Sequence, residues 1–202
     1  MFSKNLTKNS ELWYNNYIWW VLAIVHKPKQ KGKRGYMFKP GDYVIYGTNG
    51  LCQIKEVTTL SFSEDERLYY CLTPVDDEGS QLFVPVGQNK VVMRKPVSIE
   101  EIDEIMNSIP ELDEIRSTSD RAREEKYKEV MKKDDCREWM RLLKTMYVRK
   151  KTRSAEGRKM TAMDERYTKA AKQSLFSELS FVLQKDKTDI ENYITEKFES
   201  IC

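Results

Sequence analysis

The sequence contains little of what an enzyme active site normally uses. Its 202 residues include a single histidine, His26, so the usual general base and zinc ligand are almost absent. No GxxxxGKS/T, GxGxxG, HExxH or GxSxG motif occurs. The carboxylate pairs Asp76/Asp77 and Asp134/Asp135 fall where turns are expected, which favours solvated turns over an acid/base dyad. We therefore predict that the protein is not an enzyme and has no cofactor, no metal site and no small-molecule substrate.

The sequence also lacks a cysteine motif and a membrane-spanning run. Its four cysteines are far apart and form no CxxC pair, so buried or incidental thiols in a reducing compartment are expected: Cys52, Cys71, Cys136 and Cys202. The apolar run Tyr17–Val25 has nine residues, whereas a transmembrane helix needs roughly 20. We predict a cytoplasmic protein with no membrane partner. A tether formed by residues 12–26 at a membrane surface is the alternative.

Charge is distributed unevenly along the chain. The formal net charge is +3, yet residues 1–36 carry seven Lys/Arg against one Glu, which gives +6. Residues 37–96 have a net charge of −2, and residues 97–202 have 22 Lys/Arg against 23 Asp/Glu, a net charge of −1. The Lys31-Gly-Lys-Arg-Gly35 segment before Met37 is what a ribosome-binding site would encode if it were translated. We predict that residues 1–36 are an N-terminal extension that is not native or is disordered.

From Phe38 onward the pattern of turn and loop residues is typical of a small all-β module. Asn49-Gly50 supplies a turn with positive φ, and polar loops separate short apolar runs. The predicted strands are Tyr43–Tyr46, Leu51–Val57, Leu68–Val75, Gln81–Val86 and Val91–Met93. Five short strands in about sixty residues favour a small closed barrel of the SH3 or Tudor kind over residues 37–96.

After Pro96 the apolar period becomes helical. Ser98–Glu101 and Thr188–Glu191 fit the capping box, and Thr161–Asp164 is a looser variant. We predict helices near 98–108, 120–133, 135–150, 161–184 and 188–200. The predicted fold is therefore α+β with two domains: an N-terminal barrel, and an all-α domain over residues 97–202.

The helical part contains a strongly basic segment. Residues 141–160 carry eight cations against Glu156 alone, a net charge of +7: Arg141, Lys144, Arg149, Lys150, Lys151, Arg153, Arg158 and Lys159. Cations also favour helix C-termini, which is the structural alternative. Their concentration in a domain that is slightly acidic overall favours a patch that contacts nucleic-acid phosphates.

The run Leu82-Phe-Val-Pro-Val86 has a different pattern. On a strand, Leu82, Val84 and Val86 share one face while Phe83 points to the other. One face then fills the barrel, and Phe83 packs either on the helical domain or on a protein partner.

These residues resemble a known family. Met37–Tyr46, Asn49-Gly50 and Leu82–Val86 resemble the barrel shared by CarD-like regulators and the polymerase-docking domain of the transcription-repair coupling factor. Arg141–Lys151 resembles the helix of CarD-like proteins that is rich in aromatics and arginine, and Met160–Leu179 resembles their long capped helix. The similarity extends over about residues 37–184.

The resemblance implies a bacterial transcription regulator that stabilises the open promoter complex. Its barrel would bind the RNA polymerase β subunit through Leu60, Leu82, Phe83, Val84 and Pro85. Its helical domain would contact promoter DNA, mostly backbone and minor groove, through Arg116, Arg121, Arg123, Arg149, Lys150, Lys151, Arg153, Arg158 and Lys159. Asp120 stands where some members have a tryptophan wedge, and Leu60 and Phe83 replace their polymerase-facing arginines, so the docking surface is expected to be more apolar.

Overall fold

The computed structural model describes residues 38–60, 67–77, 79–87 and 91–201, which all belong to one compact unit. The predicted N-terminal extension 1–36 lies outside the described residues, and the predicted domain boundaries stay predictions. No helix of the described part is long and apolar enough to cross a membrane.

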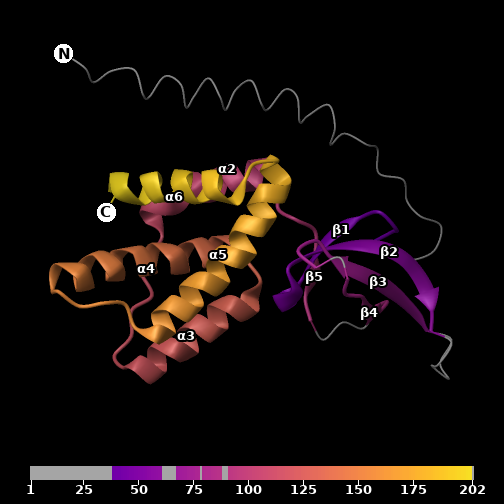
Figure 1. Ribbon diagram of the computed structural model, residues 1–202, viewed down its shortest axis with the longest axis horizontal. Helices are drawn as coiled ribbons and strands as arrows, with labels where there is room; N and C mark the ends of the chain where they lie inside the picture. Colours follow the sequence, from indigo (N-terminus) through magenta and orange to yellow (C-terminus); the bar gives the residue numbers. More distant parts are fainter. Residues whose placement is uncertain (1–37, 61–66, 78, 88–90, 202) are drawn as a thin grey trace, which may run out of the picture. The chain divides into compact units, whose positions relative to one another are not determined.

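An antiparallel sheet is followed by helices (Figure 1), as expected for an α+β chain. The strand order is β4-β3-β2-β1-β5. The strands are β1 Tyr43–Tyr46, β2 Leu51–Thr59, β3 Leu68–Pro74, β4 Leu82–Pro85 and β5 Met93–Arg94. A short 3-10 turn, η1 Gly47–Asn49, links β1 to β2, and Gly50 has the positive φ of 65° that the Asn-Gly pair predicts.

The prediction of a closed barrel is wrong for the described residues. Closure would require the edge strands β4 and β5 to pair, but β4 pairs only with β3, and β5 pairs only with β1. With two residues, β5 is too short to form a second ladder. The side chain of its Arg94 bonds instead to Glu178 and to the carbonyl of Asp134. The sheet therefore stays open, with β4 as a free edge.

One face of the sheet carries a compact apolar core. Val84 of β4 is 2% exposed and packs into this core, with Leu82 and Val86 against it, whereas Phe83 is 41% exposed. The alternation predicted for this strand is therefore confirmed. The core residues are Phe38, Val44, Cys52, Ile54, Tyr70, Leu72, Val84 and Met93.

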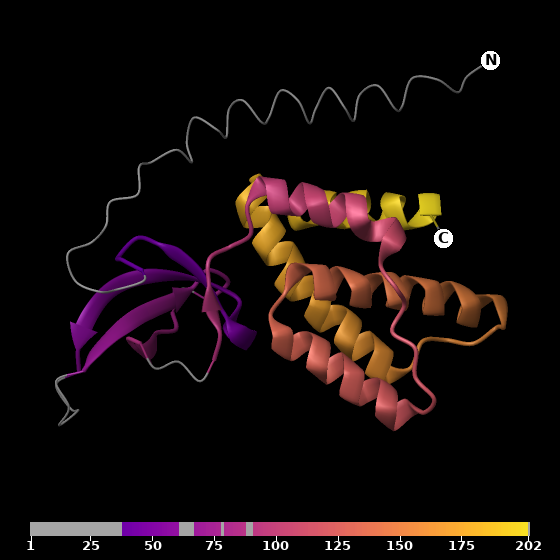
Figure 2. The same ribbon diagram turned by 180° about the vertical axis from the view of Figure 1, so that it is seen from behind.

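The helices agree closely with their predicted ranges: α2 Ile99–Ser108, α3 Asp120–Lys133, α4 Cys136–Ala155, α5 Ala162–Leu183 and α6 Lys187–Ile201, with the 3-10 turn η2 Ile109–Glu111 after α2. Helices α3, α4 and α5 pack against one another around a shared core (Figure 1 and Figure 2). Trp139, Met140 and Leu143 of α4 are buried there, and so are Leu175 and Leu179 of α5.

Two helix ends differ from prediction. Helix α4 continues five residues past 150, because its lysines and arginines are good helix formers, and it ends before Gly157, whose φ is 68°. Helix α6 starts at Lys187, where the N–H of Ile190 bonds to the carbonyl of Asp186, so Thr188 lies inside the helix and does not cap it. The Ser98–Glu101 capping box forms as predicted.

Ion pairs, hydrogen bonds and a ring contact join the sheet to the helices. Arg94 on β5 forms a bidentate ion pair with Glu178 on α5, with N–O distances of 2.6 and 2.8 Å. The ring of Tyr43 on β1 lies 4.5 Å from that of Phe181, centroid to centroid. Asp76, after β3, bonds to Ser177 and Lys187. These contacts anchor β5, β1 and the turn after β3 on α5 and the start of α6.

Candidate functional sites

The free edge of β4 presents the predicted polymerase-binding residues. Phe83 is opposite Cys71 of β3 and is 41% exposed, because its side chain points away from the face on which Val84 is buried. No described strand pairs with the outer edge of β4. Pro85 lacks an N–H, so the last residue of the strand offers only a carbonyl to a partner. An unpaired strand edge with an exposed aromatic residue is able to accept an extended segment of another protein.

The other predicted docking residues divide by burial. Val84 faces the core and is 2% exposed, so it supports the strand from beneath. Leu82 is half-buried against the same core. Leu60 follows β2, where Thr59 is opposite Leu68, and is half-buried at the same end of the sheet as Pro85. Phe83 is therefore the most accessible apolar side chain of this set.

Seven of the nine predicted DNA-binding residues fall into two groups, and the other two, Arg153 and Arg158, line the pocket described below. One group is exposed and points to solvent: Arg116, Arg121, Lys150, Lys151 and Lys159. Lys150 and Lys151 lie on the last turns of α4, where no carboxylate of the described residues pairs with them. Arg121 opens α3 with a side chain that is 91% exposed and loosely paired with Glu125 at 3.4 Å. Such cations are free to reach phosphates.

The second group surrounds a buried carboxylate. Asp164, in the first turn of α5, is fully buried and accepts a hydrogen bond from Arg149 at 3.1 Å. The Nε of Arg123 lies 3.7 Å from the same carboxylate, and the Tyr127 hydroxyl lies at 3.4 Å. Arg123 and Arg149 therefore connect α3 and α4 to the start of α5, a structural role that their positions in the sequence did not reveal.

The charge balance around Asp164 shifts two pKa values. Burial alone would raise the pKa of Asp164, but contacts with Thr161 and Arg149, and the positive charge of Arg123, lower it below its usual range. Burial, aided by the negative charge of Asp164, raises the pKa of Tyr127 to about 12. Asp164 is thus an anion near neutral pH, beneath the arginines.

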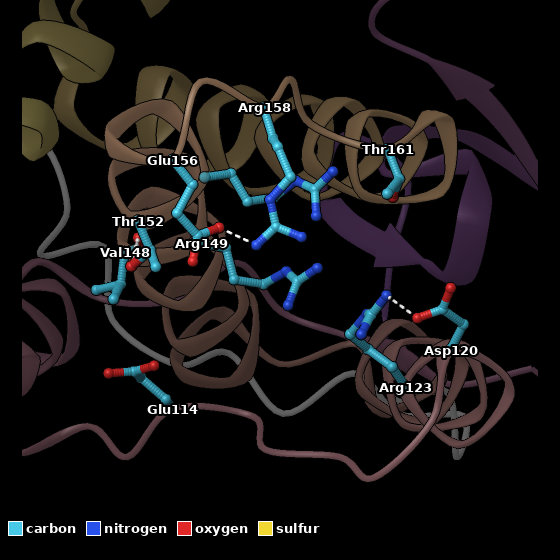
Figure 3. Close-up of a pocket in the computed structure, with 10 residues that line it drawn as sticks. Glu114, Asp120, Arg123, Val148, Arg149, Thr152, Glu156, Arg158 and Thr161 are labelled. Atoms are coloured by element: carbon cyan, nitrogen blue, oxygen red, sulfur yellow. Dashed lines mark hydrogen bonds and ion pairs between the residues drawn. The ribbon is translucent and has the colours of Figure 1, made fainter.

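A pocket of about 340 Å³ opens above this carboxylate, between the start of α3, the end of α4 and the linker to α5. Four arginines line it: Arg123, Arg149, Arg153 and Arg158. Figure 3 shows the side chains of Arg123, Arg149 and Arg158 extending into the same space from three separate segments. The carboxylates of Glu114, Asp120 and Glu156 also line the pocket. Sequence reasoning identified the four arginines but not these carboxylates or Asp164.

Two cations of the basic segment serve the fold. Lys144 is 9% exposed, and its ammonium donates to the carbonyls of Ile109, Pro110 and Leu112, which satisfies the backbone at η2. Arg141 donates to the carbonyl of Asp113 and pairs with Glu138. Of the basic segment predicted over residues 141–160, the cations from Arg149 onward therefore remain candidates for contact with nucleic acid.

The position of the tryptophan wedge holds no apolar side chain. Ser119 caps α3 through the N–H of Ala122, and Asp120, at 82% side-chain exposure, pairs with Arg123. A carboxylate is repelled by nucleic-acid phosphates, so this helix start cannot intercalate as the wedge does.

Comparison with known families agrees with the fold of the sheet. Residues 38–97 match the CarD-like/TRCF RID domain. The resemblance to CarD-like proteins is thereby confirmed over this segment, and a domain of this kind indicates a transcription-related role with RNA polymerase as the partner. The matched segment ends before α2, so the helices lie outside it. No curated protein matches the chain.

Proposed function

We propose that this protein docks on the β subunit of bacterial RNA polymerase through the free edge of β4 and contacts promoter DNA through the exposed cations of its helical part. It thereby prolongs the life of the open complex, as a binding protein of the cytoplasm and not as an enzyme. The observation that carries the docking is the exposed Phe83 on β4, a strand whose outer edge pairs with no described strand, within the matched domain.

The magnitude of the docking contact follows from the area of Phe83. About 40% of a phenylalanine surface of roughly 200 Å² remains accessible, so complete burial removes roughly 80 Å² from water. At about 25 cal/mol per Å² this is about 2 kcal/mol, or roughly a 30-fold change in affinity. Phe83 is expected to be a dominant contact for the partner.

Phe83→Ala tests this docking. The dissociation constant between the full chain and purified RNA polymerase is expected to rise roughly 30-fold. Tyr193→Ala is the matched control, because Tyr193 on α6 is also an exposed aromatic, at 38%, and should leave the affinity unchanged. Equal affinities of the Phe83→Ala variant and the unmodified chain would refute docking through β4.

The DNA contact is supported by the exposed cations on α4 and at the start of α3, which neutralise phosphates without reading bases. If three or four phosphates are contacted, log K falls against log salt with a slope of about −3. Lys150→Gln with Lys151→Gln should reduce the slope by about 2. An unchanged slope would favour the alternative, a module that binds polymerase or another factor with no DNA contact.

A further inference from the structure

The arginine pocket has features that the proposed contact with duplex DNA does not use. Its guanidinium groups converge on one concave space, whereas Lys150 and Lys151 lie exposed on the neighbouring surface of α4. The volume of about 340 Å³ is at the lower end of the ~300–1,000 Å³ usual for small-molecule sites. The pocket is therefore large enough for a small ligand with one or two anionic groups.

Several donors in the pocket form no hydrogen bond. The Nε atoms of Arg123 and Arg149 are buried and have no hydrogen-bond partner among the described residues, although the Nε of Arg123 lies 3.7 Å from Asp164. Arg153 donates its Nε to the carbonyl of Lys159, and no hydrogen bond within the described part of the chain uses its two terminal nitrogens. Thr161, at the positive end of the 22-residue helix α5, also lines the pocket. Buried donors without a hydrogen bond, beside a helix N-terminus, form an environment that favours a multiply charged oxyanion.

Exposed carboxylates form ion pairs with two of the pocket arginines. Arg158 pairs with Glu156 and Arg123 pairs with Asp120, and these two carboxylates are 46% and 82% exposed. Glu156 can turn into solvent at little cost, because it and Arg158 are both about half exposed and surface ion pairs contribute ~0–1 kcal/mol. Asp164 stays in place, since it is fully buried beneath Arg149. An incoming anion would therefore replace Glu156 on Arg158 without disturbing the core.

We propose that this pocket binds the terminal phosphate of a small phosphorylated molecule, which Arg149, Arg153 and Arg158 hold. Glu156 pairs with Arg158 when no ligand is bound. The terminal group of a phosphate monoester is dianionic near neutral pH and enters a concave site end-on. A phosphodiester of DNA carries one negative charge and is flanked on both sides by sugars. Its neighbouring phosphates would meet Glu114, Asp120 and Glu156 around the pocket. The ligand goes beyond the proposed DNA contact and does not depend on it.

Calorimetric titration of the full chain with inorganic pyrophosphate tests the proposal. Saturable 1:1 binding is expected, with higher affinity than for sulfate, a dianion without a second charged group. Arg158→Gln should weaken binding at least about tenfold, as expected for the loss of a hydrogen bond between charged groups, and Arg153→Gln should act in the same direction. Glu156→Gln should strengthen binding several-fold, because it removes the competing carboxylate. Lys150→Gln, a neighbour outside the pocket, should change the affinity less than twofold.

One control separates loss of binding from loss of folding, and another separates a small phosphorylated ligand from the phosphates of DNA. Arg158 is 57% exposed, so Arg158→Gln should leave the melting temperature nearly unchanged. Titration with a 20-base-pair duplex should be weakened by Lys150→Gln and not by Arg158→Gln, the reverse of the pyrophosphate pattern. Absence of saturable pyrophosphate binding would overturn the proposal, and so would equal sensitivity to Arg158→Gln and Lys150→Gln. Stoichiometric displacement of pyrophosphate by the duplex would show that backbone phosphate fills the pocket instead.

Discussion

Replacing Glu178 by Gln should strongly destabilise the junction between sheet and helices. The Glu178 carboxylate is 1% exposed and accepts hydrogen bonds from both terminal nitrogens of Arg94. It also accepts hydrogen bonds from the N–H of Val97 at 2.8 Å and from the thiol of Cys136 at 3.2 Å. Glutamine has the same shape but no charge, and its NH₂ group would face one of these donors. Removing one member of a buried pair costs about 3–5 kcal/mol. Because Arg94 is 23% exposed and can be partly rehydrated, we expect about 3 kcal/mol.

Thermal unfolding followed by circular dichroism measures this loss. For a chain of this length, about 3 kcal/mol corresponds to a fall of roughly 6–12 °C in Tm. Lys187→Gln is the control, since its ion pair with Asp76 also joins helix to sheet but is about half exposed on both sides, and it should cost less than about 1 kcal/mol. In the cycle with Arg94→Gln, the double variant should lose less than the sum of the single variants. A Glu178→Gln variant as stable as Lys187→Gln would refute the reasoning.

Two buried aspartates should respond to pH in opposite directions. Burial raises the pKa of Asp134 to about 6, only partly offset by Arg94, so its folded carboxylate is penalised as pH rises through about 6. Asp134→Asn should therefore add up to about 3 kcal/mol in urea unfolding at pH 7.5 and nothing near pH 4, and a pH-independent effect would contradict this. Asparagine also suits the left-handed backbone at this position, where φ is 53°. The pKa of Asp164 is lowered, so its contribution is present above about pH 4 and is lost as pH falls below that. Asp164→Asn should cost about 3–5 kcal/mol at pH 7, with a deficit that shrinks in acid; a constant deficit would argue against the ion pairs.

Local sequence signals predicted most of the fold, because strands and helices depend on nearby residues. The Asn49-Gly50 turn and the Ser98–Glu101 capping box are satisfied within a few residues, and both formed as expected. Closure of the barrel depends on whether two distant edges meet, and no short pattern encodes that. The pairing of Arg94 with Glu178 spans 84 residues and was also missed. The one available signal was that Glu178 stands among apolar residues, next to Leu179.

The candidate DNA-binding site was predicted only in part, because it too depends on contacts between residues that are distant in the sequence. Charge density identified the basic segment but could not separate Lys150, which faces solvent, from Lys144, which caps a turn 34 residues away. Nor could it show that Arg123 and Arg149 share one buried carboxylate, since Asp164 was noticed only as part of a helix cap. Spatial convergence of three segments creates the pocket, and spacing in sequence does not reveal it.

The lifetime of open promoter complexes, measured by heparin challenge with and without the protein, tests the central claim most directly. The unmodified chain should lengthen that lifetime. Phe83→Ala should abolish the effect through loss of docking, and combined Lys150→Glu and Lys151→Glu should abolish it while polymerase affinity is retained. A lifetime that is lengthened equally by all three proteins would contradict the account.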